Sequence, residues 1–357
     1  MRRAKMVAAA VFLVLGTGLG FTHGRTITVD DDGPADFSTI QAAIDDANEG
    51  DTVFVALGTY KEDVIMKDGV NLQGAGAEET TIDGCGMYTV VRGANSCRLD
   101  GFTITGYVDY DIHGVYCEHA QNLTISHNII KNNTEYGIFY YGQISSLVIS
   151  NNIIVGNRSG GIYCSTWEAH PETEALIINN IICDNHHSNQ DICLWSGTSP
   201  MFVNNIIGGF EYCDHWGSPL FMWNNILSHQ TGGSNISVEP MFVARGHYDW
   251  DTWTWYDGDY HLKSEARHWD ANGGRWTKDE VTSPCIDAGD PMTPIGLEPF
   301  PNAGIINMGA YGGTAEASKS YFGNPPCEVI VAGDVNGDCK VNFLDFRLMA
   351  LHWLEER

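Results

Sequence analysis

Between residues 128 and 227 the chain repeats a short pattern of one polar and two apolar residues. The triplet Asn-Ile-Ile or Asn-Ile-Leu begins at five positions, 20 to 28 residues apart: Asn128, Asn152, Asn180, Asn205 and Asn225. A period of this length with an apolar pair in each unit predicts a solenoid, in which each coil buries the face that its neighbour exposes. Because asparagine side chains both donate and accept, equivalent ones in successive coils can form a hydrogen-bonded ladder. We therefore expect an all-β fold of stacked coils.

Each coil is expected to hold three strands. The first precedes the asparagine bend, the second begins at the apolar pair, and the third follows a loop of variable length. Third strands are predicted at residues 114–118, 137–141, 161–165 and 191–195. Side chains alternate between the two faces of a strand, so inward-pointing positions leave outward-pointing columns beside them. The inward positions are expected to be Val115, Ile138, Ile162 and Ile192.

These repeats resemble the right-handed parallel β-helix of the pectate-lyase superfamily over about residues 50–315. The segment Phe37-Ser-Thr-Ile-Gln41 reads as a capping box with Ser38 as N-cap, opening a short helix that Gly50 ends. The resemblance implies that this helix, within residues 25–50, covers the open end of the first coil. Residues 239–318 resemble the closing segment of secreted bacterial β-helix proteins. The expected β-helix thus spans residues 25–318.

The two ends of the chain have a different character from the repeats. Residues 1–24 carry basic residues, an apolar run and small residues, the pattern of a secretory signal peptide. The segment 319–326 reads as a linker and 327–357 as a small calcium-binding repeat. We expect a secreted protein, extracellular or at the cell surface, with no membrane-spanning segment.

The C-terminal repeat spaces oxygen ligands as calcium loops do. Side chains fall at loop positions 1, 3, 5, 9 and 12, with a backbone carbonyl at position 7. The positions are Asp334, Asn336, Asp338, Lys340 (by its carbonyl), Asn342 and Asp345. The motif resembles one repeat of a type I dockerin, which implies Ca²⁺ and possible docking to a cohesin-like scaffold. Cys339 stands where such loops have glycine, and no second repeat follows, so a calcium-stiffened tail is an open alternative.

Charge and cysteine content limit the partners. The formal net charge is −26, which argues against nucleic acid because phosphates require a basic face. An anionic polysaccharide would need a locally basic spot or bridging calcium. Cys117 and Cys164 are predicted to lie two coils apart, about 9.6 Å, beyond the reach of a disulfide. Cys327 and Cys339 are a better pair.

Aromatic residues fill the predicted outward columns of the third sheet. One column holds Tyr116, Phe139, Tyr163 and Cys193, and the next holds Glu118, Tyr141, Ser165 and Trp195. Exposed aromatic strips are costly unless a ligand stacks on them, and sugar rings present flat apolar faces. The resemblance also implies a polysaccharide groove on this sheet. We expect substrate contacts from Tyr116, Phe139, Tyr163 and Trp195, with Glu118, His113 and Tyr141 as catalytic candidates.

Three functions remain open at this point. A polysaccharide lyase needs a base and a cation, yet only Lys131 and Arg158 are basic between Gly101 and Phe242. A glycoside hydrolase needs two carboxylates. The motifs of pectin methylesterases and polygalacturonases are missing, which favours a non-catalytic sugar-binding or cell-surface protein. Of these three functions, we predict a polysaccharide lyase ahead of the hydrolase and the binding protein. The tryptophans Trp250, Trp253 and Trp255 either pack on the solenoid or face a sugar.

Overall fold

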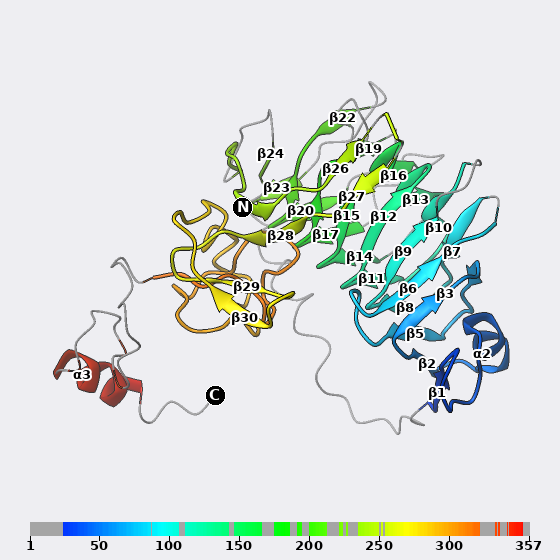
Figure 1. Cartoon of the computed structure of the whole chain (residues 1–357), viewed down its shortest axis with the longest axis horizontal. Helices are drawn as coiled ribbons and strands as arrows, with labels where there is room; N and C mark the ends of the chain where they lie inside the picture. The colour runs from blue at the N-terminus through cyan, green and yellow to red at the C-terminus, as the bar shows by residue number, and fades with distance from the viewer. Residues whose placement is uncertain are drawn as a thin grey trace, which may run out of the picture.

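The chain forms a solenoid whose coils run from β1 at one end to β24 at the other (Figure 1). This computed structural model describes residues 24–321 and, near the C-terminus, 333, 335, 341 and 343–352. Gaps within the first range are residues 87, 107–110, 143–145, 166–174, 186–190, 195–199, 213–220, 224–225, 228–234, 250 and 253. The predicted signal peptide, the tryptophans Trp195, Trp250 and Trp253, and Cys327 and Cys339 lie outside the described residues. No helix among the described residues is long and apolar enough to cross a membrane.

Three parallel sheets make the walls of the solenoid, and each coil from β2 to β22 gives one strand to each sheet. Sheet A contains β1 (Thr26–Val29), β2 (Thr52–Val55), β5 (Asn71–Gly74), β8 (Arg98–Asp100), β11 (Thr124–Ser126), β14 (Leu147–Ser150), β17 (Ala175–Ile178), β20 (Met201–Val203) and β23 (Phe221–Trp223). Sheet B contains β3 (Gly58–Tyr60), β6 (Thr80–Asp83), β9 (Thr103–Gly106), β12 (Ile129–Asn133), β15 (Ile153–Val155), β18 (Ile181–Ile182), β21 (Ile206–Ile207) and β24 (Ile226–Leu227). Sheet C contains β4 (Val64–Ile65), β7 (Thr89–Arg92), β10 (His113–Glu118), β13 (Tyr136–Tyr141), β16 (Gly160–Ser165), β19 (Ile192–Leu194) and β22 (Phe210–Tyr212).

The predicted asparagine ladder is present at the turn between sheets A and B. Asn128, Asn152, Asn180 and Asn205 are buried. The side-chain oxygens of Asn152, Asn180 and Asn205 each accept hydrogen bonds from the asparagine one coil earlier, and that of Asn128 accepts from the backbone N–H of Phe102. The residue before each ladder asparagine adopts a positive φ, for example 55° at Asn151 and Asn179. Asparagine tolerates this left-handed conformation better than most residues, which explains the doubled asparagines.

A second ladder follows at the turn between sheets B and C. Its members are Asn133, Asn157 and Asn185, five residues after the asparagines of the first ladder, and it ends on the carboxylate of Asp191. The motif Asn-Ile-Ile-x-x-Asn carries this signal, but its second asparagine reads in the sequence as an ordinary loop residue. The two ladders tie each coil to the next at two of its three corners.

The register of sheet C is as predicted. Val115 pairs with Ile138, Ile138 with Ile162, and Ile162 with Ile192, and all four side chains are fully buried. Cys117 and Cys164 flank Tyr140 inside the core as free thiols, so the expectation that they do not form a disulfide is confirmed. Inward and outward faces are therefore assigned by the pairing itself.

The short helix predicted near the N-terminus is α2 (Ile40–Asp46), but the predicted capping box is wrong. Its N-cap is Thr39, which makes no side-chain cap hydrogen bond. Instead the Glu62 carboxylate, from the loop after β3, accepts from the backbone N–H groups of Ile40 and Gln41 at 2.8 and 2.9 Å. A residue distant in sequence thus replaces the local cap, and the helix ends at Asp46, before Gly50. The role of this helix as an end cover stays a prediction.

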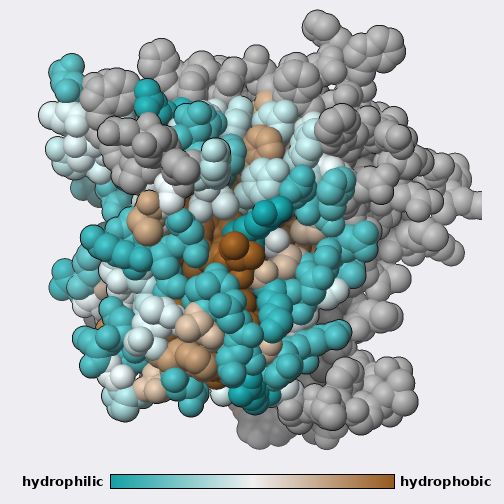
Figure 2. Space-filling model, turned by 90° about the vertical axis from the view of Figure 1, so that its right-hand side faces the viewer, coloured by the Kyte–Doolittle hydropathy of each residue, from teal (hydrophilic) through white to brown (hydrophobic). Residues whose placement is uncertain are grey.

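Viewed from the N-terminal end, hydrophilic residues surround a narrow central strip of apolar surface (Figure 2). This face includes the first coils and α2 (Figure 1). Most of the apolar material is inside the solenoid, where one continuous cluster runs from Ile27 to Ile207. The core, rather than the surface, therefore holds the coils together.

The closing segment folds back over the outer face of sheet B. It contains three antiparallel pairs, which are β25 (Phe242–Ala244) with β28 (Asp259–Leu262), β26 (His247–Asp249) with β27 (Thr254–Tyr256), and β29 (His268–Asp270) with β30 (Arg275–Thr277). Phe242, Tyr260 and Leu262 pack on Ile153 and Ile181, residues of sheet B that point out of the coil. Sheet B is therefore buried on both faces in its later coils.

Two details of the segment refine the sequence predictions. Trp255 packs against this second cluster, and the backbone of Gly156 in sheet B lies under its ring. Of the two alternatives for that tryptophan, packing is the one observed. Lys319 and Ser320, predicted as linker, are hydrogen-bonded through their backbone N–H groups to Arg267 and Pro301. The closing segment therefore continues at least to Ser320. The last element is helix α3 (Phe343–His352).

Candidate functional site

Three aromatic rings form a stack on the outer face of sheet C. Tyr116, Phe139 and Tyr163 are register partners on β10, β13 and β16. The ring centroids of Tyr116 and Phe139 lie 5.5 Å apart with an interplanar angle of 6°, and those of Phe139 and Tyr163 lie 4.5 Å apart at 3°. All three side chains are partly exposed. The structure thus brings together three of the four predicted substrate contacts, while Trp195 lies outside the described residues.

An ion pair borders this stack on the side of the first coils. The Arg92 guanidinium of β7 lies 3.0 Å from the Glu118 carboxylate of β10, with side-chain exposures of 51% and 37%. Arg92 is the register partner of Tyr116, and its Cζ lies 6.0 Å from the centre of that ring. Glu118 in turn pairs with Tyr141 on β13. A cation, a carboxylate and a phenol therefore meet at one edge of the stack.

Sequence reasoning missed Arg92 because the inventory of basic residues began at Gly101. The signal was available, since Val91 and Arg92 lie 24 residues before Val115 and Tyr116, one coil of the repeat. Extending the period backwards by one unit would have placed Arg92 at the head of the aromatic column. The prediction that this sheet lacks a basic side chain is therefore wrong, because Arg92 lies on it.

His113 lies at the opposite end of β10 from Glu118. Five residues of extended strand separate the two, which is about 16 Å between Cα atoms. The His113 ring packs 4.5 Å from the ring of Phe139, and burial lowers the pKa of His113 to about 4, against the opposing effect of the Asp111 carboxylate. The three predicted catalytic residues are therefore split, with Glu118 and Tyr141 together and His113 apart.

The hydrogen bonding of His113 fixes its tautomer. The backbone N–H of Tyr136 donates to Nδ1 of His113 at 3.3 Å. In the neutral ring, an acceptor Nδ1 leaves the proton on Nε2. His113 then presents a hydrogen-bond donor rather than a free base.

Glu135 adds a carboxyl group beside His113. Burial raises the pKa of Glu135, Ser159 counters this with a side-chain hydrogen bond, and the negative charge of Asp111 adds to the rise. A carboxyl group of raised pKa can donate a proton at a pH where ordinary carboxylates are ionised.

Only one of the predicted calcium ligands falls among the described residues. Asp345, at the start of α3, is fully buried, and its Oδ1 accepts a hydrogen bond from the backbone N–H of Val335 at 2.8 Å. The carboxylate at loop position 12 thus lies against the start of the loop, on the side where the other predicted ligands begin. The other predicted ligands, Asp334, Asn336, Asp338, Lys340 and Asn342, lie outside the described residues. Asp345 therefore fits a calcium loop.

Comparison with known proteins identifies the architecture. A family model described as "Right handed beta helix region" matches residues 60–176. The solenoid is a right-handed β-helix. No curated protein matches the chain.

Solved structures similar to this right-handed β-helix come from carbohydrate-active enzymes. An alginate lyase from Paenibacillus sp. strain FPU-7 is 17% identical, with a TM-score of 0.43, over 57% of this chain and 76% of that one. A pectin methylesterase from carrot is 14% identical, with a TM-score of 0.42, over 61% and 88% of the two chains. An alpha-1,3-glucanase from Streptomyces thermodiastaticus is 18% identical, with a TM-score of 0.36, over 48% and 37%. At such identities the likeness concerns the fold alone.

Proposed function

We propose that this β-helix protein binds an acidic polysaccharide along the outer face of sheet C and cleaves it as a lyase. The observation that carries the proposal is the stack of Tyr116, Phe139 and Tyr163 with the Arg92–Glu118 pair at its edge. The stacked rings cover one another's faces, and their partly exposed edges form a continuous apolar strip that successive sugar rings would contact. Arg92 supplies the local positive charge that a polyanion needs on a protein of net charge −26.

The proposed chemistry is β-elimination on a uronate residue. A base removes the proton at C5, the C4–O bond of the glycosidic linkage breaks, and a C4–C5 double bond forms. Arg92 would pair with the uronate carboxylate and stabilise the charge that develops beside C5. Glu118 is the candidate base or Ca²⁺ ligand, and the phenol of Tyr141, its register partner, would give a proton to the leaving oxygen.

Glycoside hydrolysis is a second candidate, favoured by the raised pKa of Glu135. Hydrolases of this kind use one protonated and one ionised carboxyl group. Glu135 would be the acid and the exposed Asp111 its ionised partner. A non-catalytic sugar-binding protein on the same scaffold is the outcome if neither reaction occurs.

One set of assays separates the three functions. The protein is incubated with pectate, alginate and other uronic polysaccharides while the ultraviolet absorbance of the new double bond is followed. Absorbance that rises with new reducing ends indicates a lyase, reducing ends alone indicate a hydrolase, and binding without either indicates a binding protein.

Four variants then test the site. Tyr163→Ala, which removes one ring of the stack, should weaken polysaccharide binding by about 1 kcal/mol, as should Trp195→Ala, and Tyr256→Ala in β27 is the aromatic control. Tyr141→Ala should in addition reduce turnover, because Tyr141 is the proposed proton donor. Glu118→Gln should leave binding nearly unchanged and reduce turnover. Aromatic variants that unfold several degrees earlier with unchanged affinity would contradict the assignment of this face as a groove.

We further propose that the chain is secreted and that residues 327–357 bind Ca²⁺. The disulfide-bonded state of Cys193 supports an oxidising compartment, and the fold-back of Asp345 supports the calcium loop. Docking to a cohesin-like scaffold rests on the sequence motif alone.

A further inference from the structure

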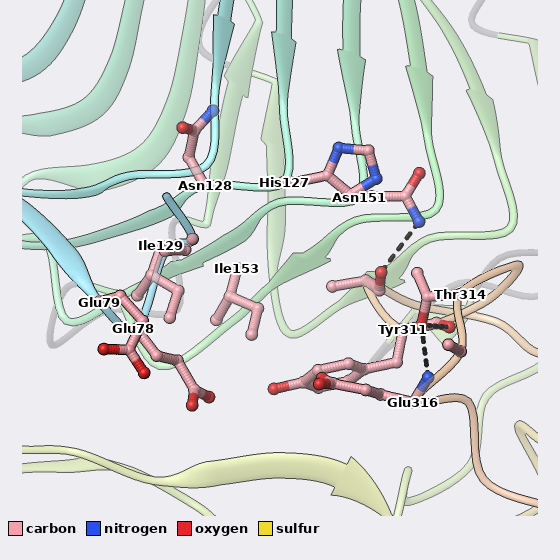
Figure 3. A pocket seen from close by; sticks show the side chains of 14 residues that line it. Glu78, Glu79, His127, Asn128, Ile129, Asn151, Ile153, Tyr311, Thr314 and Glu316 are labelled. Carbon is pink, nitrogen blue, oxygen red and sulfur yellow. Dashed lines mark hydrogen bonds between the residues drawn. The ribbon is translucent and has the colours of Figure 1, made fainter. Parts of the chain in front are cut away.

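A cavity of about 450 Å³ lies between the solenoid and the closing segment, at the turn joining sheets A and B. One wall is the turn of residues 76–79, a second is the ladder turn of residues 127–129 with Ile153, and the third is the segment of residues 310–316. Figure 3 shows Glu78 and Glu79 on one side of this space and Tyr311 and Glu316 on the other. None of these residues belongs to the outer face of sheet C. The cavity is therefore separate from the site proposed above.

The walls of the cavity are fixed by hydrogen bonds. The side-chain amide of Asn151 donates to the backbone carbonyls of Ala310 and Gly312, both at 2.9 Å. The Gly309 N–H donates to the carbonyl of Asn204 at 2.8 Å, on another coil of the same turn. The start of the segment that lines the cavity is thus attached to two coils of the solenoid. A space held open in this way needs little rearrangement to bind a ligand.

The lining combines apolar surface with negative charge. Ile129 and Ile153 contribute apolar surface, and Glu78, Glu79 and Glu316 contribute carboxylates. Among the described residues that line the cavity, none is a lysine or arginine. Burial and the nearby charge of Glu316 raise the pKa of Glu78. Two carboxyl groups that repel each other across a cavity would be stabilised by a cation between them.

A buried histidine behind the lining leaves a polar atom without a hydrogen bond. The His261 ring stacks on Tyr311 with centroids 3.7 Å apart and is 1% exposed at its side chain. Its Nδ1 lies 2.7 Å from the Asp259 carboxylate, but Nε2 has no hydrogen-bond partner and lies 3.7 Å from Glu316. Because 3.7 Å is too long for a hydrogen bond, His261 leaves the Glu316 carboxylate able to accept one from a ligand. Even with His261 protonated, the four acids Glu78, Glu79, Glu316 and Asp259 leave the surroundings negative.

The spread of the carboxylates selects among possible cations. In the described part of the chain, only Asp30, Asp31 and Asp32 bring three metal-ligand atoms within 4.8 Å of one another. The carboxylates of the cavity are farther apart, so they suit a larger cation with several N–H donors better than a compact metal ion. Apolar walls with a few charged groups are typical of small-molecule sites of this volume.

We propose that this cavity binds an organic ammonium ion, supplied by an amino sugar or by a polyamine. The ammonium group lies between Glu78 and Glu316, and the carbon skeleton contacts Ile129, Ile153 and the Tyr311 ring. Uronate sugars are excluded by charge, so the ligand differs from the polyanion proposed for sheet C.

Calorimetric titration of the full chain at physiological salt tests the proposal. The probes are the β-1,4-linked disaccharide of glucosamine, spermidine, the N-acetylated form of the same disaccharide, and a galacturonate disaccharide. We expect one-to-one saturable binding of at least one ammonium probe, with the tighter of the two identifying the source. Neither the N-acetylated nor the galacturonate disaccharide should bind at the same concentration.

Matched carboxylate variants locate the site. Glu78→Gln and Glu316→Gln should each lower the affinity about tenfold, the effect of one lost charge-assisted hydrogen bond. Glu280→Gln, an exposed acid outside the cavity, should bind as the unaltered protein does. If either cavity variant fails to fold by thermal melting, Glu79→Gln replaces it. Three results would overturn the proposal. They are the absence of saturable binding by either ammonium probe, equal binding of the N-acetylated disaccharide, and unchanged affinity in both cavity variants.

Discussion

Asp191 is a buried carboxylate at the end of the second asparagine ladder. It accepts hydrogen bonds from the backbone N–H and side-chain amide of Asn185, at 3.0 and 2.9 Å. Burial nevertheless raises the pKa of Asp191 to about 7, because desolvation of the charge outweighs these bonds. The native protein therefore holds a proton there that the unfolded chain releases at a lower pH.

This difference predicts that stability falls as pH rises from about 4 to about 7. In that window the native state binds more protons at Asp191 than the unfolded state does, so the free energy of unfolding decreases with pH, by up to about 4 kcal/mol in total. The variant Asp191→Asn removes this contribution and should show a flatter pH dependence in urea unfolding between pH 4 and 7. Glu298, whose pKa burial also raises to about 7, remains in both proteins and preserves part of the slope.

The exposed Asp251→Asn is the matched control and should follow the unaltered protein. If Asp191→Asn keeps the full slope, the carboxyl group of Asp191 does not carry the native proton.

At this scale the sequence predicted which side chains of sheet C point inward and which point outward. Two observations were sufficient for this assignment: side chains alternate between the faces of a strand, and Val115 aligns with an apolar residue in each following coil. The sequence could not predict that Glu62 caps α2 or that Tyr136 fixes the tautomer of His113, because both depend on which coil lies beside which. The sequence separation of five positions already places His113 and Glu118 at opposite ends of one strand. What each end contacts is known only from the strands that pair with β10 in the structure.

The first asparagine ladder is the element that fixes the coils to one another. The side-chain amide of Asn152 donates to the carbonyls of Ile125 and Ser150 and to Asn180 Oδ1, at 2.9 to 3.0 Å. Its oxygen accepts from the backbone and side chain of Asn128. Apart from the partly buried carbonyl of Ser150, these groups are buried away from water and have no alternative partner in solvent.

Asn152→Ala should therefore destabilise the protein by about 3 kcal/mol or more, since several buried polar groups lose their partner and each costs roughly 1–3 kcal/mol. Chemical denaturation followed by circular dichroism measures the change. Asn95→Ala is the control, because Asn95 also bridges neighbouring coils, to Asp68 and Gln121, but at the exposed surface. A loss for Asn152→Ala no larger than that of the control would show that the ladder contributes little to stability.

Periodicity explains why the elements were largely predictable and the closing segment was not. Repeating units give the same signal several times, so Asn128 and its equivalents reinforced one another. The segment after Glu239 has no repeat, and its contacts with sheet B pair residues distant in sequence, such as Arg245 with Asp184 and Lys131 with Asp257. Its site residues Tyr311 and Glu316 consequently carried no recognisable signal.

At the scale of the whole molecule, the β-helix has a core of its own that does not involve the C-terminal repeat. The two hydrophobic clusters of the described residues contain no residue beyond Tyr311. The predicted calcium loop should therefore act independently of the main fold.

We expect the double variant Asp334→Ala, Asp338→Ala to lose calcium binding and to keep the main calorimetric melting transition. Treatment of the unaltered protein with a chelator should give the same result. A large fall in the main transition temperature in either case would mean that the tail stabilises the β-helix.

The hydrogen bonds of the second ladder all run in one direction, which has a consequence for how such a protein can change in length. Each side-chain amide donates a hydrogen bond to the side-chain oxygen of the next member, and the last acceptor is Oδ1 of Asp191, which carries no amide of its own. Duplication of a complete coil upstream of Asp191 preserves the series, whereas a coil added after it meets a carboxyl group, which has no side-chain amide to continue the pattern. The second ladder therefore ends at Asp191. Related β-helices that keep this ladder but differ in length should differ by whole coils inserted before the position of Asp191.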